Sequence, residues 1–136
     1  INYNDEVFRH SLKKLAPEGV NLVIDMIGGE TADDAIKTLT WEGKFVIIGF
    51  AGGKIPKIPA NRLLLKSSSA IGLYWGQYAF INPSLIGDSF SKLMRMYEEK
   101  KLKPKIGKIF KLEEASDALN FLLSRSNTGK IVLSCN

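Results

Sequence analysis

Three glycine-containing stretches follow short apolar runs and could bring main-chain atoms close to a ligand. IGGE follows Met26, GFAGG begins at Gly49, and WGQ begins at Trp75. Glycine has no side chain, so the backbone at these points can approach a bound molecule closely. In open parallel sheets, ligands collect at the carboxyl ends of the strands. Three such loops on one edge therefore predict a binding crevice.

The sequence offers little that could do chemistry by itself. A Walker A loop needs four residues before Gly-Lys, but Gly49 to Gly53-Lys54 leaves three, and no G-x-G-x-x-G is present. His10 and Cys135 are the only histidine and cysteine, so no Ser/His/Asp, Cys/His or zinc arrangement can be assembled. We expect neither a catalytic acid–base residue nor a metal ligand here. Asp25, at a strand end, could hold a ribose hydroxyl but is more typical of a local cap.

Composition and charge indicate an ordinary soluble domain. The chain has 136 residues, of which 45% are hydrophobic and 24% charged. No apolar run approaches the ~18 residues of a membrane span, and the start lacks the pattern of a signal peptide. We expect a protein of the cytoplasm, or of the mitochondrion where a transit peptide has been removed.

The net charge of +5 comes from one segment, because residues 92–111 carry eight basic and two acidic side chains. We interpret this segment as a solvated helix end and hairpin. The alternative is a basic module that binds nucleic acid without catalysis. The segment lacks the interleaved aromatic residues of such modules, so nucleic acid is not the expected partner.

Periodicity predicts alternating helices and strands. Short apolar runs predict buried strands at Val20–Met26, Phe45–Phe50, Ala70–Trp75 and Lys130–Ser134. Amphipathic spacing predicts helices at Asp5–Leu15, Thr31–Leu39 with Thr31 as N-cap, Asn61–Lys66, Asn82–Leu102 with Pro83 at its first position, and Leu112–Ser124. Parallel strands need a crossover helix and become covered on both faces. The order therefore predicts an α/β fold with a parallel sheet.

The assembled motifs resemble a known family. The runs GVNLVIDMIGGE, LTWEGKFVIIGFAGGKIPKIPANRLLLK, GLYWG and LEEASDALNFLLSRSNTGKIVLS are similar, in this order, to the zinc-independent NADPH:quinone oxidoreductase branch of the medium-chain dehydrogenase/reductases. This resemblance implies that residues 1–136 form the later half of a Rossmann-like, doubly wound dinucleotide-binding domain plus a C-terminal helix and strand. The N-terminal catalytic domain and the glycine fingerprint would be absent. The fragment alone would then be inactive.

The resemblance also implies an NADPH site. Strand ends that match Met26, Ile48, Gly49, Phe50, Tyr74, Trp75 and Gly76 line the nicotinamide and its ribose in the family. The family's tyrosine in an I-N-Y motif and its arginine near the C-terminus match Tyr3 and Arg125, which would hold the 2′-phosphate. The planar fork of an arginine suits that task.

The implied reaction is hydride transfer from NADPH to a quinone or another conjugated carbonyl compound. Trp75 and Tyr78 are candidate contacts for that small-molecule substrate. An enoyl or acyl-thioester reductase on the same scaffold is an open alternative. Family members pair through an edge strand that matches Ala70–Trp75, so the resemblance also implies a homodimer.

Overall fold

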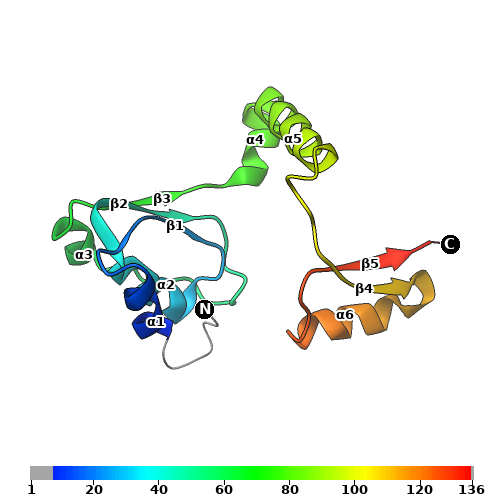
Figure 1. Cartoon of the computed structure of the whole chain (residues 1–136), viewed down its shortest axis with the longest axis horizontal. Helices are drawn as coiled ribbons and strands as arrows, with labels where there is room; N and C mark the ends of the chain where they lie inside the picture. The colour runs from blue at the N-terminus through cyan, green and yellow to red at the C-terminus, as the bar shows by residue number, and fades with distance from the viewer. Residues whose placement is uncertain (1–7, 136) are drawn as a thin grey trace. The chain divides into compact units, whose positions relative to one another are not determined.

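The computed structural model describes residues 8–135, and side chains from His10 onward. The chain divides into two compact units, Ile1–Ile81 and Asn82–Asn136, which we describe in turn (Figure 1).

The first unit is built on a three-stranded parallel sheet in the order β1-β2-β3. Its elements are α1 (Phe8–Leu15), β1 (Val20–Asp25), α2 (Gly29–Lys37), β2 (Leu39–Ile47), α3 (Ala60–Leu64), β3 (Ser69–Gly72), the 3₁₀ helix η1 (Trp75–Gln77) and α4 (Tyr78–Ile81). Helices connect the successive parallel strands, as a parallel sheet requires. The carboxyl ends of β1, β2 and β3 thus meet on one edge.

The core of this unit lies between α2 and the sheet. Ala32 and Ile36, four residues apart on one face of α2, are buried together with Leu39 and Phe45 of β2. Phe45 is completely inaccessible to solvent. Two partly buried residues pack against the same cluster: Ile58, just before α3, and Leu63, within α3. The core therefore fixes β2 relative to both helices.

Helix α2 begins earlier than the sequence predicted. Its N-cap is Gly28, not Thr31, and the helix starts at Gly29. Gly28 and Gly29 have φ angles of 75° and 63°, values that glycine adopts without strain. The side chain of Asp25 caps the turn before them. The structure thus supports the interpretation of Asp25 as a local cap.

Two strands also differ from their predicted limits. β2 starts at Leu39 instead of Phe45, and its pairing with β1 shifts after Val20. The shift falls where Glu42 has a positive φ of 56°, because β2 has three more residues than β1 between the pairs Val20–Leu39 and Leu22–Lys44. β3 ends at Gly72, and the chain turns into the 3₁₀ helix at Trp75. The strand predicted over Ala70–Trp75 is therefore Ser69–Gly72.

The second unit contains a two-stranded parallel sheet and two longer helices. Its elements are α5 (Pro83–Glu98), β4 (Ile106–Lys111), the 3₁₀ helix η2 (Leu112–Glu114), α6 (Ala115–Leu123) and β5 (Lys130–Ser134). α5 has Asn82 as N-cap, whose side chain accepts from the Leu85 N–H, and Pro83 in its first turn, as predicted.

The expected hairpin in residues 92–111 is wrong. Residues 106–111 form β4, which pairs in parallel with β5, and α6 supplies the crossover (Figure 1). Phe110 of β4 is buried and its ring lies 5.9 Å from that of Phe121 on α6. Lys108 and Lys111 interrupt the apolar positions of the strand, which masked it in the sequence.

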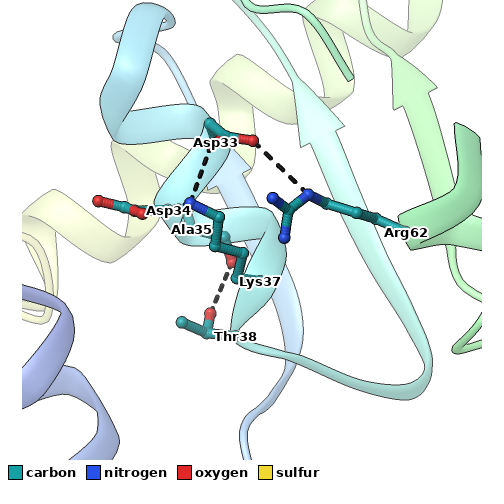
Figure 2. A network of polar contacts seen from close by, with 6 residues as sticks. All are labelled: Asp33, Asp34, Ala35, Lys37, Thr38 and Arg62. Carbon is teal, nitrogen blue, oxygen red and sulfur yellow. Dashed lines mark hydrogen bonds and ion pairs between the residues drawn. The ribbon is translucent and has the colours of Figure 1, made fainter. Parts of the chain in front are cut away.

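Polar contacts join α2 to α3 in the first unit (Figure 2). Lys37 Nζ lies 2.8 Å from Asp34 Oδ1 and 2.9 Å from Asp33 Oδ2. The carboxylates of Asp34 and Asp33 raise the pKa of Lys37. Arg62 Nε on α3 lies 3.8 Å from Asp33 Oδ1. Such partly exposed ion pairs each contribute modestly to stability.

Lys66 connects the segment before β3 to the end of α2 through hydrogen bonds made by its ammonium group. Its Nζ donates to the carbonyl oxygen of Lys37 at 2.9 Å and to that of Leu39. The last carbonyls of a helix have no partner within it and carry partial negative charge. The ammonium group satisfies them and holds the segment before β3 against the α2–β2 turn.

We predict that Lys66→Met lowers the free energy of unfolding by about 2 kcal/mol, because it removes hydrogen bonds made by a charged group. Lys57→Met is the matched control, since Lys57 is exposed, and should change stability by less than about 0.5 kcal/mol. Urea denaturation of both variants measures the difference. Equal effects would mean that Lys66 does not hold the helix end.

Candidate functional site

A hollow of about 380 Å³ lies at the carboxyl ends of β2 and β3. It is lined by residues 47–50 and 72–74. Main chain and apolar side chains form most of its wall, and Tyr74 is the only lining residue with an ionisable side chain. This is the edge on which parallel sheets bind ligands.

The hollow presents unused backbone groups. Within residues 8–135, no hydrogen bond involves the N–H groups of Gly49 and Phe50 or the carbonyl oxygens of Ile48 and Gly49. Neighbouring groups are occupied, since the Ile48 N–H donates to Asp25 O at 2.8 Å. Polar backbone groups strongly require partners when they are removed from water. This segment can therefore offer both donors and acceptors to a ligand.

The glycines of the two loops that follow β1 and β2 differ in the space that a side chain would find there. A Cβ at Gly28 would lie 2.5 Å from the Lys54 carbonyl oxygen, and one at Gly52 would lie 2.8 Å from that of Ile27. A Cβ at Gly49 would meet only the Met26 carbonyl oxygen, at an ordinary 3.6 Å. Internal packing therefore requires Gly28 and Gly52, whereas it leaves room beside Gly49.

The structure brings together four of the predicted site residues. Ile48, Gly49, Phe50 and Tyr74 line the hollow. Met26 is adjacent, because its carbonyl oxygen accepts from the Ala51 N–H at 2.9 Å.

Trp75 and Gly76 begin η1, beyond the lining. The ring of Trp75 lies 5.9 Å from that of Tyr78, so the two candidate substrate contacts neighbour each other.

The hollow has three further lining residues that were not predicted: Ile47, Gly72 and Leu73. They directly precede predicted site residues at the ends of two strands, so the sequence pattern could have indicated them. Ile47 also joins the strands, since its carbonyl oxygen accepts from the Leu73 N–H at 2.8 Å. The end of β3 was predicted three residues too late, at Trp75 instead of Gly72.

The two residues predicted to hold a phosphate are placed differently. Tyr3 lies outside the described residues. Arg125 follows α6 in the second unit, is exposed, and has a φ of 55°. Glycine is the usual residue at such a left-handed position after a helix. Lys100, which follows the C-cap of α5, has a similar φ of 57°.

Some charged groups elsewhere make local contacts. A second hollow, of about 220 Å³, includes Lys37 and Lys66, which already bind carboxylates and carbonyls. In the basic segment, Lys101 pairs with Glu99 at 2.7 Å. Lys108 Nζ lies 4.5 Å from the centre of the Phe110 ring.

The described part of the chain contains no group of three or more His, Cys, Asp or Glu side chains that could hold a metal ion. Over the same residues, no helix is both long enough and apolar enough to cross a membrane.

The chain belongs to the zinc-binding dehydrogenase family, whose model matches residues 1–133. It is 43% identical to quinone oxidoreductase-like protein 2 of Bos taurus and 42% identical to that of Mus musculus. Each match covers 98% of this chain and 39% of the relative. Prostaglandin reductase-3 of Bos taurus is 31% identical over 98% of the chain and 39% of its own length. The chain thus spans about two fifths of the length of these curated relatives.

Solved structures share the fold. The quinone oxidoreductase of Pseudomonas syringae pv. Tomato DC3000 has a TM-score of 0.81 at 24% identity, covering 98% of this chain and 41% of that one. CurK enoyl reductase has a TM-score of 0.76 at 27% identity, covering 98% and 40%. CurA of Vibrio vulnificus, solved with NADPH, has a TM-score of 0.75 at 20% identity, covering 100% and 42%.

These comparisons confirm the resemblance to quinone oxidoreductases of the medium-chain dehydrogenase/reductase superfamily and the predicted α/β class. The chain therefore belongs to an oxidoreductase superfamily.

We predict that Gly52→Ala lowers the free energy of unfolding by about 1–3 kcal/mol, the range for overpacking. A methyl group there must displace the backbone at Ile27. The matched variant Gly49→Ala should change stability by less than about 0.5 kcal/mol, because its surroundings are open. Urea denaturation compares the two, and a Gly49→Ala variant as unstable as Gly52→Ala would show that the hollow is closed.

Proposed function

We propose that the chain forms the nicotinamide side of the cofactor site in an NADPH-dependent oxidoreductase that reduces a quinone or another conjugated carbonyl compound. One observation carries the proposal: an open hollow at the carboxyl edge has unpaired backbone donors and acceptors at Ile48–Phe50. A carboxamide contains both a donor and an acceptor and fits such a backbone. The residues present therefore fit the cofactor that the fold implies.

The chain's own residues would bind and orient. The backbone of Ile48, Gly49 and Phe50 would hydrogen-bond the carboxamide, and Tyr74 would flank it, while the apolar wall excludes water. NADPH supplies the hydride when it is bound. Apart from the Tyr74 phenol, no lining side chain could give or take a proton. This segment would therefore act mainly by holding the cofactor in position. Trp75 and Tyr78 remain candidate substrate contacts.

Arg125, together with Tyr3, is proposed to bind the 2′-phosphate that distinguishes NADPH from NADH. The support is the resemblance to quinone oxidoreductases and the suitability of a guanidinium for bidentate phosphate binding.

We predict that Gly49→Ala and Arg125→Gly weaken cofactor binding in different ways. Gly49→Ala adds a methyl group to the hollow and should raise the dissociation constants of NADPH and NADH together. Arg125→Gly should raise that of NADPH by about tenfold or more, since hydrogen bonds to charged groups contribute ~1.5–3 kcal/mol, and leave NADH unchanged. Glycine also suits the backbone at residue 125, so folding is preserved.

Calorimetry on the complete protein that contains residues 1–136 measures these constants. Equal loss of both cofactors in Arg125→Gly would contradict the phosphate role. Tight binding of both cofactors by Gly49→Ala would contradict the placement of the nicotinamide.

A second candidate function is reduction of an enoyl or acyl-thioester double bond. The similarity to CurK enoyl reductase and to prostaglandin reductase-3 favours it. Both candidates share the cofactor site and differ in the substrate. NADPH oxidation measured with a quinone and with a 2-enoyl thioester separates them.

We also propose a homodimer through β3. This strand is an edge of the sheet, its four residues are exposed, and it contains no charged residue or proline that would prevent pairing. The Leu73 N–H donates to Ile47 of β2, so alternation directs the N–H of Ala70 away from β2.

We predict that the complete protein is a dimer at tens of micromolar and that Ala70→Pro makes it monomeric, because proline removes an outward donor without breaking the β2–β3 pairing. Light scattering after gel filtration measures the mass. A monomeric unmodified protein, or a dimeric Ala70→Pro variant, would contradict this interface.

A further inference from the structure

Two loops at the carboxyl edge of the sheet are joined to each other by backbone hydrogen bonds. The first comprises residues 26–29 after β1, and the second residues 48–54 after β2; together we call them the loop clasp. Its three bonds are Ala51 N–H to Met26 O at 2.9 Å, Gly52 N–H to Ile27 O at 2.8 Å, and Gly29 N–H to Lys54 O at 2.9 Å. These bonds therefore hold the two loops in a fixed position relative to each other.

Asp25 organises both loops from the end of β1. Its Oδ1 accepts from the N–H groups of Ile27 at 3.0 Å and Gly28 at 3.1 Å, which fixes the first loop. Its carbonyl oxygen accepts from the Ile48 N–H, where the second loop starts. The residue is only 7% exposed, so these bonds lie in a poorly solvated environment and are costly to lose.

Gly28 links the first loop to the wall of the hollow through its contact with Phe50. A Cβ at Gly28 would lie 2.5 Å from Lys54 O and 3.2 Å from Cδ1 of Phe50. The ring of Phe50, which lines the hollow, thus rests closely against Gly28. The φ of 75° at Gly28 also excludes most side chains.

We propose that Asp25 and Gly28 are positioning residues for the hollow, acting through the loop clasp. The inference rests on the proposed function, in which the backbone of residues 48–50 binds the cofactor. Neither residue lines the hollow, so neither needs to touch the ligand. Loops are generally mobile, whereas recognition by backbone groups requires them to be held within about 0.5 Å of the binding geometry. The clasp supplies that restraint.

The test uses Asp25→Ala and Asp25→Asn in the complete protein. Alanine removes the acceptor of two N–H groups, while asparagine keeps a side-chain carbonyl at the same place. The matched control is Asp88→Ala, because Asp88 is an exposed acid on α5. Two quantities are measured: hydrogen exchange at the amides of Ala51 and Gly52, and the dissociation constant for NADPH.

In Asp25→Ala we expect exchange at Ala51 and Gly52 to accelerate and the NADPH dissociation constant to rise, each by about tenfold, the equivalent of one lost hydrogen bond of ~1.4 kcal/mol. The amides of Phe45 and Val46 in the central strand should keep their protection, which separates a local effect from unfolding. Asp25→Asn should restore both quantities, and Asp88→Ala should change neither.

Unchanged exchange at Ala51 and Gly52 in Asp25→Ala would overturn the proposal. Faster exchange with unchanged NADPH affinity would also overturn it, because the clasp would then not set the site. If the unmodified protein binds no NADPH, the proposed function fails. The exchange data still decide whether Asp25 sets the geometry of the second loop and hence of the hollow.

Discussion

The pairing of β1 with β2 does not stop where the strands end, and the candidate site depends on this continuation. Four backbone hydrogen bonds follow the last residues of the ladder: one from Ile48 to Asp25 and the three of the loop clasp. Loops beyond strand ends usually leave their polar groups to water. Here the two loops pair several of their backbone groups with each other, while the N–H groups of Gly49 and Phe50 and the carbonyl oxygens of Ile48 and Gly49 keep no partner among the described residues. The fold therefore leaves backbone donors and acceptors beside the hollow.

Sequence reasoning could identify the glycine loops but not sort the glycines within them. Gly28 and Gly52 are constrained by carbonyl oxygens from the opposite loop, at 2.5 and 2.8 Å from an added Cβ, while Gly49 faces open space. In the sequence all three simply follow strands. The distinction depends on which backbone lies opposite, and that partner is 25 or 26 residues away along the chain. The same reason explains why Asp25 could be read as a cap but not as the residue that organises two loops.

The predicted α/β alternation was correct because long apolar runs and helix start signals are local. β4 was missed because Lys108 and Lys111 flank Ile109 and Phe110 in a strongly basic segment, and only pairing with β5 makes it a strand. The start of α2 was misplaced because Thr31 is a good N-cap in isolation, whereas Asp25 and two glycines allow an earlier start. The end of β3 was overextended because apolar Leu73–Trp75 continues the pattern past the last residue that pairs with β2.

The exposed face of the first sheet bears on the same site. Ile24, Val46 and Ile71 are paired neighbours across the three strands, on the face opposite Val23 and Phe45, and Ile24 and Ile71 are 56% and 41% exposed. Parallel sheets normally bury both faces. Two residues beyond Val46 on this face is Ile48, which lines the hollow. Whatever covers this row would therefore also reach the backbone of residues 48–50, which we propose binds the cofactor. The relatives have more than twice the matched length. A segment that covers this row of the sheet would lie beside residues 48–50, so the same segment would cover the sheet and contribute to the site.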